Sequence, residues 1–202
     1  MRKIFMLTFF IAVSNLIAQN KITMTLRDGS ILTGIGKIGN YNKIIFKKDK
    51  NDEKSIYDYK SVKNIVITYG EKERKYEYKI VEGNTNTNGN SLIKLLEPID
   101  IGNVNLFGEY SYGAIPVPMG SNGTGMNMMY SSSPKTTYFL SRKGEDIVTQ
   151  LYTNNTYSKK FMTIAEKYFE DCPKLLNKIK SKHFNRYGIE SIVSYYNNYC
   201  EN

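Results

Sequence analysis

Apolar residues recur at helical spacing through the last part of the chain, and this is the strongest pattern in the sequence. Apolar residues three or four positions apart lie on one face of a helix. The pattern predicts three short helices, at 158–170, 173–183 and 187–200. Pro173 suits the first position of the second helix, because proline is tolerated there but not in a helix interior. Gly188 belongs to the break before the third helix.

The two cysteines, Cys172 and Cys200, fall at the ends of the first and third apolar stripes. Both would therefore point toward the same small core. A bond between them would close a loop of about 29 residues and stabilise the fold by roughly 3–4 kcal/mol. The alternative is two free, buried thiols, since cysteine also packs well as a small apolar residue. We expect the disulfide, because the compartment inferred below favours it.

Alternating apolar and polar residues predict strands in the N-terminal part of the chain. Lys21 to Leu26 and Ile31 to Ile35 flank Asp28-Gly29, which is a strong hairpin signal. Further strands are expected at 43–48, 55–59 and 63–68. Short strands packed so closely predict a small barrel-like region or a curled sheet over residues 19–70.

The first hairpin also resembles a known shape. Leu26-Arg27-Asp28-Gly29-Ser30, with Gly34 following, is similar to the first hairpin of Sm-like and SH3-like small barrels. The resemblance covers only the N-terminal β region and implies a shape alone. The RNA-binding residues of Sm-like proteins are not recognisable here.

A second β region is predicted over residues 71–152, followed by the helical tail over 153–202. Its strands are expected at 75–81, 92–96, 104–112, 136–142 and 147–152, and they would form an antiparallel sheet. The segment 113–135 contains Pro116, Pro118 and Pro134 with several glycines and serines, so we expect an irregular loop there. Strands followed by helices indicate an α+β fold.

The N-terminus has the layout of a secretory signal peptide. A basic start, Met1-Arg2-Lys3, precedes an apolar run from Ile4 to Ala12 and a small residue at Ala18. We expect residues 1–18 to be removed after Ala18, and the alternative is an uncleaved anchor. No other apolar run approaches membrane-spanning length. The mature protein would therefore be periplasmic or secreted, would not span a membrane, and would keep its disulfide.

The chain is basic, with a net charge of +9 at neutral pH that falls to +7 when the signal peptide is removed. Most of the excess is dispersed lysine. Lys174, Lys178 and Lys182 form a possible basic patch along the second predicted helix, which suits an anionic polymer or lipid head groups. The alternative is an ordinary solvated helix face. Nucleic acid is not an expected partner of an exported protein.

Several enzyme classes are incompatible with this sequence. The chain has one histidine, His183, so it cannot build a zinc site from several histidines. A Cys-His nucleophilic dyad conflicts with the disulfide. There is no Gly-x-Ser-x-Gly elbow, no phosphate-binding loop and no complete dinucleotide-binding glycine pattern. No catalytic residue and no cofactor are predicted, although paired hydrolytic carboxylates are brought together only by the fold.

Four methionines give a weak candidate for metal binding. Met119, Met126, Met128 and Met129 fall within or at the tip of the predicted irregular loop. Thioether sulfurs are soft ligands that select Cu(I). The alternative is that they give a flexible loop some apolar contact.

The tail resembles a group of bacterial proteins. Glu170-Asp171-Cys172-Pro173, followed by Tyr195-Tyr196-Asn197-Asn198-Tyr199-Cys200, is similar to uncharacterised secreted proteins of Bacteroidota, in which a β-rich body precedes a helical tail. The resemblance implies an exported bacterial protein and no activity. The sequence therefore favours a non-enzymatic binding or interaction module whose partner is an envelope or extracellular protein or polymer. The alternatives are a hydrolase of envelope polymers with unidentified carboxylates, and a Cu(I)-binding protein.

Overall fold

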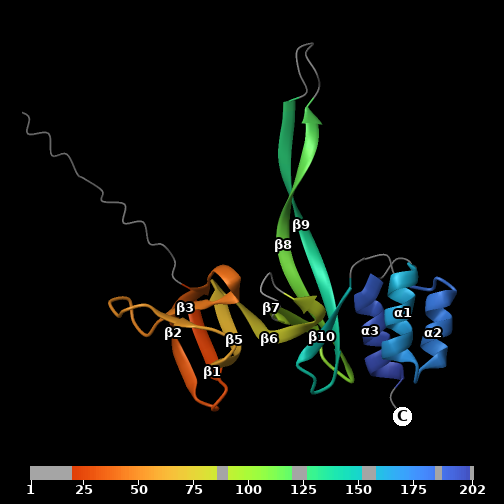
Figure 1. Cartoon of the computed structure of the whole chain (residues 1–202), viewed down its shortest axis with the longest axis horizontal. Helices are drawn as coiled ribbons and strands as arrows, with labels where there is room; N and C mark the ends of the chain where they lie inside the picture. Colours follow the sequence, from red (N-terminus) through yellow and green to blue (C-terminus); the bar gives the residue numbers. More distant parts are fainter. Residues whose placement is uncertain (1–19, 86–90, 120–126, 152–157, 185–187, 201–202) are drawn as a thin grey trace, which may run out of the picture.

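The computed structural model describes residues 20–85, 91–119, 127–151, 158–184 and 188–200. Figure 1 shows a β-rich body, a two-stranded ribbon that projects from it, and three helices grouped at one side. The α+β class predicted from the sequence is confirmed. The predicted signal peptide and its cleavage after Ala18 lie outside the described residues.

The strands of the described residues pair into one sheet, in the order β10-β9-β8-β7-β6-β5-β1-β2-β3-β4, and β10 also pairs with β6. That extra pairing closes strands β6 to β10 into a five-stranded barrel, from which β5 and β1 to β4 extend as an open sheet. The strands are β1 (Lys21–Leu26), β2 (Ile31–Ile38), β3 (Ile44–Lys47), β4 (Ser55–Tyr57), β5 (Val62–Tyr69), β6 (Lys72–Thr85), β7 (Ser91–Asp100), β8 (Val104–Met119), β9 (Asn127–Arg142) and β10 (Ile147–Leu151).

The barrel closes because β6 is long enough to pair with two strands along the same edge. Residues 72–77 of β6 pair with β5, and Ile80 and Val81 pair with β10. The β10–β6 pairing is parallel, so the sheet expected to be antiparallel is mixed. Pairing with β10 covers an edge of β6 that would otherwise expose unpaired backbone groups. The barrel interior is filled by Val81, Leu96, Phe107, Phe139 and Val148.

The N-terminal strands form a curled sheet. The predicted hairpin is confirmed: Gly29 has φ +88°, and the Asp28 carboxylate accepts a hydrogen bond of 2.9 Å from the Ser30 N–H. The three further predicted strands are present as β3, β4 and β5. The buried residues of β1, β3 and β5 share one core, which extends to Tyr78 and Leu95 of the barrel. Among the described residues, the sheet buries this face mainly by curling on itself.

The irregular loop expected over 113–135 is wrong for residues 113–119 and 127–135, and its remaining residues, 120–126, lie outside the described part of the chain. Strands β8 and β9 continue through this segment in an unbroken antiparallel register, from Val104 opposite Arg142 to Met119 opposite Asn127. Figure 1 shows these strands leaving the barrel as a projecting ribbon. Proline was the reason for expecting a loop, but proline is tolerated in a strand where its nitrogen faces an open edge.

The three predicted helices are confirmed as α1 (Lys159–Phe169), α2 (Pro173–Lys180) and α3 (Gly188–Tyr199). The Ser158 side chain caps α1 by accepting from the Phe161 N–H, and Pro173 begins α2 as expected. Helix α2 ends earlier than predicted, because the backbone turns at Lys182, where φ is +62°. The helices pack on the barrel in one core that includes Val104, Leu106, Leu140 and Leu151 of the strands. Among the described residues, no helix is long and apolar enough to cross a membrane.

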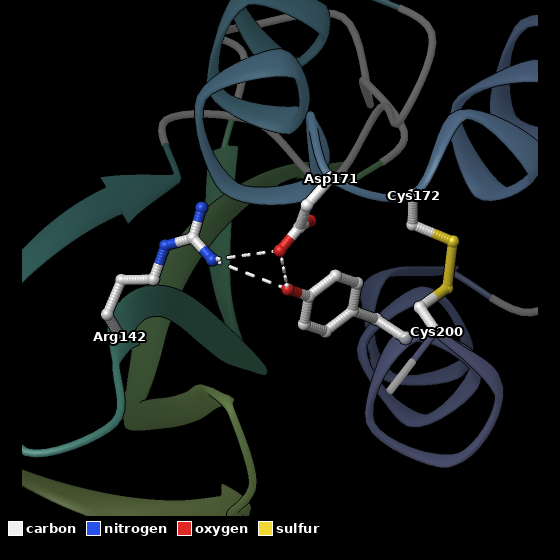
Figure 2. The surroundings of a disulfide bond; sticks show 5 residues. Arg142, Asp171, Cys172 and Cys200 are labelled. Atoms are coloured by element: carbon white, nitrogen blue, oxygen red, sulfur yellow. Dashed lines mark hydrogen bonds and ion pairs between the residues drawn. A yellow bond between two sulfur atoms is a disulfide. The ribbon is translucent and has the colours of Figure 1, made fainter. Parts of the chain in front are cut away.

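The predicted disulfide between Cys172 and Cys200 is confirmed, with 5.7 Å between the Cα atoms. Beside it, a polar brace joins the barrel to the helices (Figure 2). The Tyr196 hydroxyl donates to Asp171 Oδ2 at 2.6 Å, and Arg142 Nη1 of β9 lies 3.6 Å from the same carboxylate oxygen. Arg142 also donates to the Tyr196 hydroxyl at 3.3 Å. The disulfide and the brace thus hold the helical tail at one position on the barrel.

We expect partly buried tyrosines to make the fold sensitive to alkali. Burial raises the pKa of Tyr76 to about 12. Burial, with a hydrogen bond to the Glu190 carboxylate, raises the pKa of Tyr138 to about 12. A raised pKa means that the folded protein holds the phenolic proton more tightly than the unfolded chain, whose tyrosines ionise near pH 10. The stability that these groups contribute is complete below that pH and is lost as the pH rises toward 12.

We therefore expect alkaline unfolding between about pH 10 and 12, with phenolate absorbance rising together with loss of the far-ultraviolet circular dichroism signal. Tyr138→Phe should flatten the dependence of stability on pH in this range, because it removes one late-ionising group. Tyr41→Phe, at a side chain that is 93% exposed, is the matched control. Complete phenolate formation while the fold persists would contradict the prediction.

Candidate functional site

A groove lies where the curled sheet meets the barrel. It consists of two hollows, of about 190 and 520 Å³, which share the lining residues Tyr78, Lys79 and Asp146. The smaller hollow is also lined by Arg27, Tyr59, Lys60, Ile80 and Ile93, and the larger one by Lys63, Asn64, Lys75, Glu77, Ile101, Asn105, Phe107 and Gly144. We call the two together the junction groove.

Lys79 lies at the centre of the junction groove and is 8% exposed. Its Nζ is 3.6 Å from a carboxylate oxygen of Glu77 and 3.6 Å from one of Asp146. It donates to the Glu145 carbonyl at 3.2 Å and lies 5.0 Å from the centre of the Phe107 ring. A buried charge must be compensated by such partners. The floor of the groove is therefore a fixed cation above an aromatic ring.

The walls add further positive charge. Arg27 and Lys60 line the smaller hollow, and Lys63 and Lys75 line the larger one. Lys75 pairs with Glu77 at 2.9 Å. Within the part of the chain that the structure describes, Arg27, Lys60 and Lys63 form no ion pair.

The charge in the groove is unbalanced. Five lining residues are cationic and two, Glu77 and Asp146, are carboxylates. The nearby Asp58 accepts from the Lys60 backbone N–H at 2.9 Å and keeps its negative charge, so cations still outnumber carboxylates when it is included. Arg27 is held in place because its Nε donates to the Tyr59 carbonyl at 2.6 Å. A groove with this excess attracts anionic groups.

A second cleft, of about 650 Å³, lies between the barrel and α1. Its polar groups bind one another. Thr149 donates to Glu82 at 2.5 Å, and Lys167 pairs with the same carboxylate at 3.0 Å. The Thr149 hydrogen bond and then Lys167 lower the pKa of Glu82. The Tyr168 hydroxyl lies 2.9 Å from Thr149 and donates to the Leu140 carbonyl. These contacts fasten α1 to the barrel and leave few groups for a ligand.

The three lysines of the predicted basic patch are placed differently from one another. Lys174 and Lys178 belong to α2, whereas Lys182 lies beyond the end of that helix. The Lys178 ammonium lies 5.5 Å from the centre of the Tyr195 ring, so it faces α3. The helical spacing that suggested the patch therefore applies to Lys174 and Lys178 alone. His183 is exposed, also beyond α2, with its ring 5.3 Å from that of Phe184.

The methionines of the copper hypothesis are near the tip of the ribbon. Met119 ends β8, Met128 and Met129 follow the first residue of β9, and Met126 lies outside the described residues. In the backbone register, Met119 stands opposite Asn127 and Met129 opposite Val117. Copper binding stays a prediction.

The junction groove is not predicted by the sequence. A partial signal exists in β6, where Lys75, Glu77 and Lys79 alternate with Tyr76 and Tyr78 and so share one face of a strand. Nothing in the sequence indicates that Asp146 and Phe107 meet this face. Those two residues come to it from the turn before β10 and from β8.

No known protein family, no curated protein and no solved structure matches this chain. The resemblance to secreted proteins of Bacteroidota stays a prediction. The function must therefore be argued from the geometry of the molecule.

Proposed function

We propose that this protein is a non-enzymatic binding protein of the cell envelope or exterior, and that it binds an acidic polymer in the junction groove. The proposal rests on the charge around the groove. Five of its lining residues are cationic and two are carboxylates, and a buried lysine lies at its centre. The export of the protein is part of the proposal, and the disulfide supports it.

The arrangement suits a polymer better than a single small anion. Arg27 and Lys60 line one hollow, Lys63 and Lys75 line the other, and Lys79 lies between them. One exposed ion pair contributes only about 0–1 kcal/mol. Binding at successive cations adds such contributions along one ligand chain. The partly exposed ring of Tyr59 offers an apolar surface beside the charges.

The hydrolase alternative would use the two carboxylates of the groove. Glu77 and Asp146 both contact Lys79 Nζ at 3.6 Å. An acid and base pair would instead face a substrate across open space. Their shared contact supports the role of holding Lys79 in place, and for this reason we favour binding over hydrolysis.

The proposal is tested by titrating the mature chain, residues 19–202, with a sulfated glycan such as heparin and with a carboxylated one such as polygalacturonate. Neutral dextran is the negative control. We expect calorimetry to detect binding of at least one anionic polymer, with affinity falling as salt rises, because salt screens exposed charges over about 10 Å at 0.1 M. Release of shorter fragments during the titration would favour the hydrolase alternative.

The paired variant Lys60→Gln with Lys63→Gln should weaken binding by about tenfold or more, since it removes two unpaired cations of the groove. Its matched control is Lys37→Gln with Lys54→Gln, which makes the same change in net charge at exposed lysines that line neither the groove nor the predicted basic patch. Equal losses in the two variants would overturn the groove as the site, because only net charge would then matter. Failure of every anionic polymer to bind at low salt would overturn the function.

A further inference from the structure

The ribbon has two outer edges, and the structure determines which backbone groups face them. We define the ribbon as residues 109–119 of β8 with residues 127–137 of β9. Beyond Gly108 and Tyr138, these segments pair with each other and with no third strand among the described residues. Figure 1 shows the ribbon projecting away from the barrel and the helices.

The outer edge of β8 is identified at its base by Val104. The Val104 N–H donates to Asn197 Oδ1 at 3.1 Å, and the Val104 carbonyl accepts from the Asn197 side chain at 2.9 Å. Both groups therefore face away from β9. Backbone direction alternates along a strand, and the register is unbroken to Met119. Every second residue from Val104 faces outward, and these include Pro116 and Pro118.

The outer edge of β9 follows in the same way. The Leu140 carbonyl faces away from β8, because it accepts from the Tyr168 hydroxyl at 3.0 Å. Alternation then places the backbone groups of Met128, Tyr130 and Ser132 on the outer edge, followed by Pro134.

The two edges consequently differ in their capacity to add a strand. Proline has no N–H, so β8 cannot donate outward at Pro116 or Pro118 near the tip. The β9 edge keeps outward N–H groups at Met128, Tyr130 and Ser132. Prolines on an edge are a common protection against strand addition. Here Pro116 and Pro118 protect β8 near the tip, whereas Pro134 interrupts β9 further toward the barrel and leaves its edge open from Met128 to Ser132.

Apart from Glu109 and Lys135 near its base, the ribbon carries no charged residue, although the chain is basic. No charged residue occurs from Tyr110 to Pro134, although the whole chain carries +9. Two copies can therefore bring their ribbons together without placing like charges against each other. A bilayer is a poor alternative, because the unpaired backbone groups of an isolated ribbon would be unsatisfied in hydrocarbon.

We propose that the open β9 edge pairs with the β9 edge of a second copy of this chain. A two-fold axis at Tyr130 would oppose Met128 of one copy to Ser132 of the other, with about six backbone hydrogen bonds. An isolated pair of strands is only marginally stable. In the dimer, the two ribbons would form one four-stranded sheet. Its outer strands would both be β8, whose prolines remove the outward donors nearest the tip and so oppose the addition of a further strand there. This inference is independent of the groove and of its ligand.

The test is the oligomeric state of the mature chain by sedimentation velocity, from about 1 µM to about 1 mM. We expect a monomer–dimer equilibrium. Tyr130→Pro removes the central outward donor without touching the ladder to β8, and it should raise the dimer dissociation constant about tenfold or more. Tyr130→Val keeps the donor and is the matched control. Circular dichroism of each variant verifies that the barrel and helices remain folded.

A second variant tests the blocked edge. Pro116→Ala with Pro118→Ala restores the outward donors of β8, and we expect assemblies larger than a dimer. A wild-type chain that stays monomeric over the whole range would overturn the proposal. So would a dimer that Tyr130→Pro leaves unchanged. A wild-type monomer that binds an extended strand of another protein along β9 would replace self-pairing with a heterologous partner.

Discussion

The double variant Cys172→Ser with Cys200→Ser is expected to lose about 3–4 kcal/mol of unfolding free energy. The disulfide joins residues 28 positions apart, and the loop that it closes restricts the unfolded chain by about this amount. The bond also ties the start of α2 to the end of α3. The loss should be measured by urea unfolding of the mature chain under oxidising conditions. Hydrogen exchange should accelerate most in α2 and α3, since the bond holds these two helices together.

Reductant provides the matched control for this prediction. Wild-type protein in reductant should approach the stability of the double variant, and reductant should leave the variant itself unchanged. The two cysteines are the only ones in the chain, so no other bond contributes. A double variant as stable as the oxidised wild type would show that the polar brace and the core hold the tail without the disulfide.

Phe169→Ala is expected to destabilise the protein by about 3–5 kcal/mol, because it opens a cavity in a well-packed core. Phe169 ends α1 and is fully buried. Its ring lies 5.1 Å from that of Tyr196 of α3, within the core that the helices share with the barrel. The substitution should therefore loosen the contact of α1 with α3 as well as with the strands.

Glu166→Ala is the matched control on the same helix. Glu166 forms an exposed ion pair of 3.5 Å with Lys180, and such pairs contribute about 0–1 kcal/mol. Both variants should be compared by urea unfolding. Where the slope of the unfolding free energy against urea concentration is the same in both, the difference between their midpoints reports the difference in stability. A loss below about 1 kcal/mol for Phe169→Ala would contradict the packing seen at this position.

The segment around Pro116 and Pro118 shows where sequence reasoning fails and why. Proline argues against a strand because it removes a hydrogen bond from the ladder. That argument holds only where the N–H faces a neighbouring strand. Alternate spacing of the two prolines places both nitrogens on the same edge, and in this fold that edge is open. Whether an edge has a neighbour depends on strands distant in the chain, so a local pattern does not reveal it.

Local spacing also failed to predict which basic residues lie together in the folded protein. Lys174, Lys178 and Lys182 were grouped because helical spacing makes them neighbours, yet α2 ends at Lys180 and the backbone turns at Lys182. The cations of the junction groove are dispersed from Arg27 to Lys79 in the sequence. They converge because β5 pairs with both β1 and β6, which brings three distant segments to one place.

By itself, the sequence determined the elements whose signals are local. The apolar stripes predicted three helices, alternation with Asp28-Gly29 predicted the first hairpin, and two cysteines at the ends of stripes predicted their bond. Only the tertiary structure decided the closure of the barrel by β10 on β6, the course of the ribbon and the convergence of cations around Lys79. The physical reason is how far apart in the sequence the contacting residues are. Helices, turns and alternation are set by neighbours a few residues apart, whereas strand pairing and grooves are set by contacts between residues far apart in the chain.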